Sequence, residues 1–157
     1  IGVDRARWRT TLNYRVLPRL NLGVELNPGE AEVGPLVTWF LVTERGARPG
    51  IFLGTSSDRI GTPAGEQSYY ATATRSLPGL PLSAYVTLNY SEFDDGLNVP
   101  FGAELDLAGT LPVALSLRGM YDGERSHAML THAREHWAAS LLLVWLERPG
   151  ISVALGF

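Results

Sequence analysis

Hydrophobic and polar residues alternate along most of this chain. Residues 20–27 read LNLGVELN, with leucine or valine at every second position and Asn, Gly or Glu between them. A period of two is typical of a β-strand with one apolar and one polar face. Eleven such segments follow one another, separated by stretches rich in Gly, Pro, Asn and Asp. The pattern predicts a single all-β domain, 1–157, folded as an antiparallel meander whose strands lie at 8–16, 20–27, 36–44, 51–59, 67–77, 81–91, 99–108, 112–121, 126–133, 137–146 and 151–157.

One stretch also fits a helix. Residues 128–146 read AMLTHAREHWAASLLLVWL and could form a single helical segment. Two strands are favoured because large and small residues alternate through Trp137, Ala139, Leu141 and Leu143, and because REH and ERPG are typical turn sequences.

Composition narrows the class of protein. The net charge of −3 over 157 residues gives no basic footprint, so nucleic acid is not an expected partner. All 13 cations are arginines, and the absence of cysteine excludes disulfides and thiolate metal sites. The longest apolar run, 138–146, is far shorter than the roughly 20 residues of a membrane helix. The first residues, IGVDRARW, lack the pattern of a secretory signal, so we expect an exported protein in its mature or shortened form.

The polar positions indicate which face points outward. A soluble barrel needs an outer face rich in lysine and glutamate, whereas here the polar positions are mostly Ser, Thr, Asn, Gly and Ala. Strands of about ten residues match the span of a tilted membrane strand. Aromatic rings also lie near predicted strand ends, as in the aromatic girdles of membrane barrels; these rings are Trp8, Tyr14, Trp39, Tyr90, Phe101, Tyr121, Trp137, Trp145 and Phe157. The sequence therefore predicts a transmembrane β-barrel with its apolar face toward lipid, with a soluble sandwich or barrel as the alternative.

Strand parity raises the expected count to twelve. Bacterial single-chain barrels have even numbers of strands, so residues 1–3, before a possible turn DRAR, would be the stub of a twelfth. If the last strand ends on the periplasmic side, the turns LPR, GARPG, PGL, GTL and REH are periplasmic, and PGEAEVGP, IGTPAGE, EFDDGLN, DGER and ERPG are external. Ten strands, with 126–136 as one long loop, is the alternative.

The same alternation defines a set of polar residues expected to face the lumen. If the GTL turn places Asp106 opposite Ser116, then Glu104 lies directly opposite Arg118, and opposite charges at such sites stabilise a sheet. We expect these charges to fill the lumen, the alternative being that they line a permeation path. The complete predicted set is Arg9, Asn13, Arg15, Glu25, Arg75, Asn89, Glu104, Asp106 and Arg118.

Several phrases resemble known outer-membrane proteins of Gram-negative bacteria. The closing GISVALGF is similar to the C-terminal assembly signal of such barrels, with Ile151, Val153, Leu155 and Phe157 at alternate positions. The phrases SLPGLPLSAYVTLNY, NVPFGAEL and PVALSLRGMYDGERSHAML resemble hairpins of the YjbH-like family of exopolysaccharide-associated barrels. The resemblance implies insertion by the outer-membrane assembly machinery. The chain is shorter than typical members of that family and lacks their periplasmic domain.

Candidate chemistry is sparse. His132 and His136 would share a metal only on a helix, and there is no HExxH motif. Glu124, Ser126 and His127 lie close together in the sequence. Neighbours on a strand point to opposite faces, so we do not expect them to form a nucleophile arrangement. The paired carboxylates Asp94 and Asp95 are followed by glycine, which is typical of a turn. We predict no catalytic residue, metal or cofactor, and no enzyme activity.

Together these features predict an integral outer-membrane barrel with a structural or secretion-associated role, such as exopolysaccharide export. A passive porin for small solutes and a lipid-modifying enzyme are the alternatives. The expected partners are outer-membrane lipid and lipopolysaccharide, the assembly machinery and other envelope proteins.

Overall fold

The structure is a computed structural model that describes residues 8–29, 31–57, 65–108 and 113–156. Strands and turns make up this described part of the chain, and it contains no helix. None of its segments is a helix long and apolar enough to cross a membrane. The predicted all-β class is confirmed.

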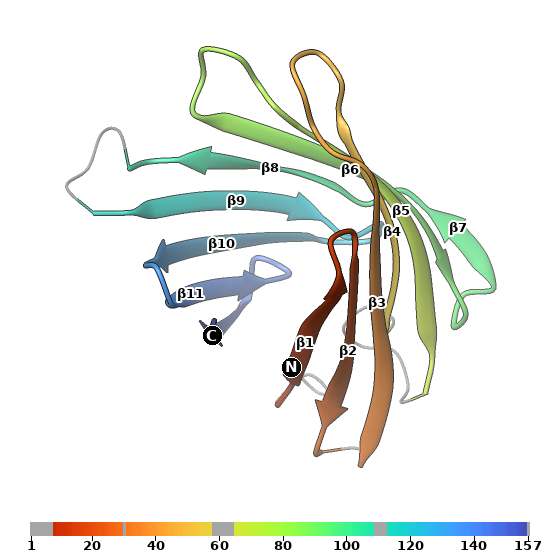
Figure 1. Cartoon of the computed structure of the whole chain (residues 1–157). Helices are drawn as coiled ribbons and strands as arrows, with labels where there is room; N and C mark the ends of the chain where they lie inside the picture. The colour runs from red at the N-terminus through yellow and green to blue at the C-terminus, as the bar shows by residue number, and fades with distance from the viewer. Residues whose placement is uncertain (1–7, 30, 58–64, 109–112, 157) are drawn as a thin grey trace. The chain divides into compact units, whose positions relative to one another are not determined.

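Twelve strands form one antiparallel meander. Figure 1 labels most of them and shows successive strands running side by side. Their bounds are β1 (Thr10–Leu17), β2 (Leu20–Asn27), β3 (Glu32–Val42), β4 (Gly50–Ser57), β5 (Gln67–Ser76), β6 (Leu82–Ser91), β7 (Gly96–Asn98), β8 (Phe101–Asp106), β9 (Leu115–Tyr121), β10 (Ser126–Ala133), β11 (Trp137–Val144) and β12 (Arg148–Leu155).

The twelfth strand is not the one expected from the sequence. Each strand pairs with the next, except that both β7 and β8 pair with β6. β7 lies off the main path, which therefore contains eleven strands. β7 lies wholly within EFDDGLN, which the sequence predicts as a loop. Residues 1–3, the predicted stub, lie outside the described residues. The ten-strand and helical alternatives are both wrong, because β10 and β11 are separate strands.

The chain divides into two compact units. The first comprises residues 1–73 and 87–99, and the second comprises 74–86 and 100–157. Strands β5 and β6 each contribute residues to both units, so the meander is continuous through them.

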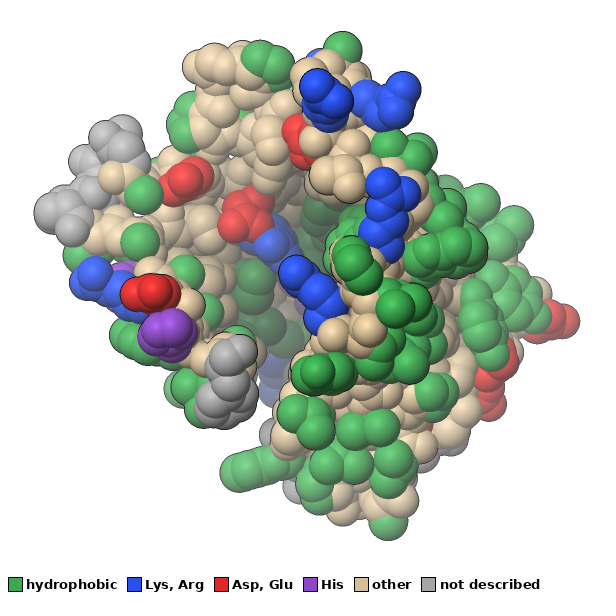
Figure 2. Space-filling model, viewed as in Figure 1, with side chains coloured by type: hydrophobic (Ala, Val, Ile, Leu, Met, Phe, Trp, Pro, Cys, Tyr) green, Lys and Arg blue, Asp and Glu red, His purple; other side chains and the backbone are tan. Residues whose placement is uncertain are grey.

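In the first unit, alternation places apolar side chains on the exposed face and polar ones on the buried face. Along β2, Leu22, Val24 and Leu26 are 42%, 38% and 39% exposed, whereas Glu25 and Asn27 are 0% and 1% exposed. β6 repeats the pattern, with apolar side chains exposed and Thr87, Asn89 and Ser91 buried. Figure 2 shows many hydrophobic side chains gathered on the surface of this unit. This polarity is the reverse of a water-soluble domain, in which apolar residues are the buried ones.

Aromatic side chains occupy another part of the first unit. Phe40 and Phe52 lie opposite each other on β3 and β4 with ring centroids 5.8 Å apart, and Tyr70 meets Phe52 edge-on at 6.3 Å. Gly54 leaves room for the Tyr70 ring, because a Cβ there would overlap it. This cluster departs from the pattern of apolar residues on one face only. The sequence indicates the departure, since residues 36–44 are apolar on both faces.

In the second unit, one apolar row crosses six neighbouring strands. The paired residues are Leu82, Leu105, Leu117, Leu130, Leu141 and Ile151. The adjacent positions form a polar row on the opposite face: Asp106, Ser116, Thr131, Ser140 and Ser152. Cross-strand rows of like residues arise because side chains on paired strands project to the same face. The Glu104–Arg118 and Asp106–Ser116 pairs have the register predicted from the sequence. The GTL turn itself lies outside the described residues.

The last hairpin turns earlier than the sequence predicts. Arg148, Pro149 and Gly150 belong to β12, and the turn is made by Trp145 and Leu146, with φ angles of 57° and 56°. Glu147 N–H donates to the Val144 carbonyl across it at 3.1 Å. Two positive φ angles match the right-handed twist of a hairpin, although bulky residues rarely adopt them.

The strand path ends at β1 and β12. All eight residues of β1 are exposed, as are all of β12 except Gly150. Among the described residues, strand pairing includes no β1–β12 ladder, so the structure shows a sheet and leaves the predicted closure into a barrel as a proposal.

Candidate functional site

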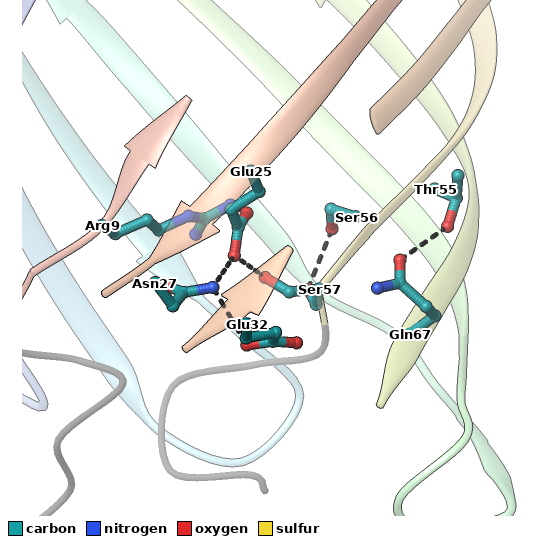
Figure 3. A network of polar contacts seen from close by, with 8 residues as sticks. All are labelled: Arg9, Glu25, Asn27, Glu32, Thr55, Ser56, Ser57 and Gln67. Carbon is teal, nitrogen blue, oxygen red and sulfur yellow. Dashed lines mark hydrogen bonds and ion pairs between the residues drawn. The ribbon is translucent and has the colours of Figure 1, made fainter. Parts of the chain in front are cut away.

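A buried polar network at one end of the first unit is the first candidate. Asn27, at the end of β2, donates through Nδ2 to Glu25 Oε1 at 2.9 Å and to Glu32 Oε2, on β3, at 3.0 Å (Figure 3). Glu25 and Asn27 are fully buried and Glu32 is 9% exposed. An amide that bridges two carboxylates fixes both, because each accepts one of its two hydrogens.

Further donors surround the two carboxylates. Ser57 Oγ, at the end of β4, donates to Glu25, and the Arg9 guanidinium forms an ion pair with the other oxygen of Glu25. The backbone N–H of Gly65 donates to Glu32 at 2.7 Å. Buried charges are costly unless they are paired and hydrogen-bonded, so these contacts offset part of the cost of burying the two carboxylates. It ties together the ends of β2, β3 and β4.

Uncharged polar groups continue on the same face of β5 and β6. Thr72 and Thr87 are hydrogen-bonded through their hydroxyls at 2.8 Å. Both are buried, as are Ser68, Asn89 and Ser91. The interior of this unit thus changes from ionic to hydroxyl-rich along the chain.

The second unit has a groove of about 500 Å³ on its polar face. Ser83, Glu104, Asp106, Ser116 and Thr131 line it, together with small and apolar residues. Arg118 Nε donates to Glu104 Oε2 at 2.8 Å, which holds this carboxylate. Asp106 instead accepts the N–H of Ala108 at 2.8 Å and stays exposed. The groove therefore combines one neutralised and one open carboxylate with several hydroxyls.

The remaining predicted lumen residues have varied surroundings. Asn13, opposite Gly23, lies over it, so a Cβ at Gly23 would overlap the Asn13 side chain. Arg15 is opposite Asn21 and exposed. The Arg75 Nε is buried without a hydrogen-bond partner in the described residues, and Asn89 pairs with Asn98. That the whole set lines a lumen stays a prediction.

A cluster around His127 joins two turns of the second unit. His127 Nε2 lies 2.8 Å from Asp122 Oδ2, and His127 Nδ1 accepts the backbone N–H of Trp145 at 3.4 Å. The Arg125 guanidinium stacks 4.5 Å from the centre of the Trp145 ring. Both nitrogens of His127 are thus engaged, and Glu124 and Ser126 are not the residues that hold it. Sequence analysis missed Asp122 and Trp145, although the short DGER turn, flanked by residues of one hairpin, could have indicated Asp122.

Asp122 is the anchor of this cluster. Burial would raise its pKa, but donors at Arg125 N, His127 and Glu124 N outweigh burial and hold the pKa of the carboxyl below its ordinary value. The two backbone donors lie at 2.7 and 2.9 Å. The ionised form of Asp122 is therefore favoured in the folded chain.

The other candidate residues lie apart from any such cluster. His132 Nδ1 is 3.0 Å from the Ala114 carbonyl, and His136 is near exposed Glu135 at 3.8 Å. Asp95 has a φ of 46° and accepts from the Tyr90 hydroxyl at 2.6 Å, in keeping with turn chemistry. Within the ranges that the structure describes, no group of three or more His, Cys, Asp or Glu side chains is placed to hold a metal.

The predicted C-terminal signal residues project from β12. Ile151, Val153 and Leu155 are 78%, 66% and 68% exposed, on one face of the strand. Phe157 lies outside the described residues.

Comparison of the chain with protein-family models, with curated proteins and with solved structures finds no match. The resemblance to the YjbH-like family stays a prediction from the sequence. Function is accordingly inferred from which side chains the fold exposes and buries.

Proposed function

We propose that the chain is an integral β-barrel protein of the bacterial outer membrane, with a structural or secretion-associated role. A single observation carries the proposal: in the described residues 29 large hydrophobic side chains are exposed, and the one buried hydrophobic residue is Val144. Each large apolar side chain kept from water stabilises a protein by about 1.5–3 kcal/mol. A lipid environment supplies that stabilisation, whereas water does not.

Closure of the sheet follows from the same environment. In hydrocarbon every backbone N–H and C=O must be paired, so neither edge strand can stay open. The path of eleven strands makes β1 and β12 run in the same direction, so a direct pair between them would be parallel. We propose that both edges gain partners on insertion, which completes the barrel.

The role within the envelope rests on the resemblance of the strand phrases. It supports exopolysaccharide export as the process and the outer-membrane assembly machinery as the partner that recognises β12. Lipid and lipopolysaccharide are the proposed surroundings of the apolar face.

A passive pore is the second candidate. The groove of the second unit favours it, because Ser83, Asp106 and Thr131 give a polar surface that water and small solutes can follow. Single-channel recording in a planar bilayer separates the candidates. A steady conductance altered by Asp106→Arg supports the pore, and a silent bilayer supports the structural role.

Membrane insertion is tested with a variant that keeps only Trp39, which is 52% exposed on β3. The purified chain is refolded into phosphatidylcholine vesicles, floated on a density gradient and compared with vesicles whose acyl chains carry bromine. We expect co-flotation and strong quenching of Trp39. A chain that stays monomeric in buffer without detergent, with unquenched Trp39, would contradict the proposal.

A further inference from the structure

The tip of the β3–β4 hairpin presents two arginines side by side. Arg45 N–H donates to the Arg48 carbonyl at 3.1 Å, and Arg48 N–H donates to the Arg45 carbonyl at 3.0 Å. Gly46, with a φ of 59°, and Ala47 make the turn between them. Residues that exchange both hydrogen bonds are directly opposite, so their side chains leave the same side of the hairpin.

This placement is unfavourable for the isolated chain. Like charges directly opposite each other destabilise a sheet, and the arginine charge cannot be relieved by deprotonation. Arg45 and Arg48 are both exposed, and within the described part of the chain neither has a carboxylate at ion-pair distance. Two adjacent guanidinium groups are well suited to a phosphate, which each can bind through paired N–H donors.

The surroundings indicate where that phosphate comes from. The strands that lead to this end carry exposed apolar side chains, among them Leu17 at 59% and Trp39 at 52%. Figure 2 shows arginine side chains over the β3–β4 loop, with an acidic side chain beside them, and hydrophobic side chains along the strands. The Arg19 carbonyl accepts Phe40 N–H at 2.8 Å, which adds a third arginine at the same end of the unit. An apolar face that ends at a basic rim is complementary to a leaflet with anionic headgroups.

We propose that Arg45 and Arg48 form a binding site for the phosphate of an anionic phospholipid headgroup. The site rests on the proposed membrane function. That function alone requires only the hydrocarbon of a bilayer, whereas this site adds a preference for anionic headgroups. In this arrangement the acyl chains of the lipid lie along the apolar face, and its headgroup stays at the hairpin tip.

The experiment measures lipid binding by native mass spectrometry of the folded chain in a neutral detergent. Phosphatidylglycerol and phosphatidylcholine are titrated separately into the wild type, into Arg45→Gln/Arg48→Gln and into a control, Arg134→Gln/Arg148→Gln. The control removes two exposed arginines of the second unit and so causes the same change of net charge. We expect the wild type and the control to bind phosphatidylglycerol about tenfold more tightly than phosphatidylcholine, the effect of one or two charge-assisted hydrogen bonds. The hairpin variant should show no preference.

Three results would overturn the site: equal affinities for both lipids in the wild type, loss of preference in the control, or displacement of the lipid by millimolar inorganic phosphate, which would indicate a soluble anion as the ligand. Insertion into pure phosphatidylcholine vesicles is measured first. Failure to insert contradicts the membrane function itself, whereas insertion without a lipid preference contradicts only the headgroup site.

Discussion

Glu104 on β8 lies directly opposite Arg118 on β9, and Arg118 Nε donates to Glu104 Oε2 at 2.8 Å. The two side chains are 30% and 39% exposed, so water partly screens their attraction. The pair joins two neighbouring strands on the polar face and sets their register.

The Glu104–Arg118 pair should show a measurable coupling. We expect Glu104→Gln and Arg118→Gln each to destabilise the fold, and the double variant to lose about 0.5–1 kcal/mol less than the sum of both. Urea unfolding of the chain in lipid vesicles gives the free energies. Asp106→Asn is the control, because Asp106 is exposed and, among the described contacts, its carboxylate accepts a hydrogen bond from Ala108 N–H in its own turn. Strict additivity of the two changes would show that the pair contributes nothing.

The network around Asn27 predicts a larger effect. Asn27→Asp replaces the bridging amide by a third carboxylate between Glu25 and Glu32, and removes the donor that both accept. Because like charges in a buried site cannot all stay ionised, we expect a loss of roughly 3 kcal/mol at pH 7. Asn13→Asp, on exposed β1, provides the comparison and should change stability little. An equal effect at both positions would contradict the buried network.

Asp122 predicts a pH dependence of definite sign. The pKa of the Asp122 carboxyl is lower in the folded chain than its ordinary value of 3.8, so ionised Asp122 adds stability above that value, and the contribution is lost as pH falls through the folded pKa. The stability difference between wild type and Asp122→Asn should therefore be largest at neutral pH and vanish below the folded pKa. Thermal unfolding between pH 7 and pH 2 measures it. A constant Asp122→Asn difference at every pH would refute the role of ionisation.

Sequence alternation predicts the fold well where neighbouring positions differ in polarity. It places the strand pairs of β8 and β9 in register and predicts eleven strands of the path. It misses β7, because Gly96–Asn98 is only three residues long and follows turn-forming aspartates. It also misplaces the last turn, since the left-handed backbone at Trp145 has no signal in residue type.

The candidate sites depend on contacts that alternation does not encode. Glu25 is predicted as inward-facing, but Asn27 and Ser57 reach it, and Asn27 links it to Glu32, only because ends of β2, β3 and β4 lie close together. Similarly, His127 is singled out from the sequence with Glu124 and Ser126, whereas Asp122 and Trp145 are its partners. The geometry of the turns decides which residues contact His127. The sequence of a short turn does not show which of its carboxylates makes the contact.

A matched pair of leucines tests the environment of the apolar face. Leu141, in the middle of β11, and Leu80, in the β5–β6 turn, are each 60% exposed. If the apolar face contacts lipid, Leu141→Arg should destabilise the chain by about 2–4 kcal/mol, as a charge near the bilayer midplane does, and Leu80→Arg by about 0–1 kcal/mol. Unfolding in vesicles measures both. If the face contacts water, both substitutions should change the free energy of unfolding by the same small amount, because the two leucines are equally exposed. A similar cost at both sites would therefore remove the main support for a membrane protein.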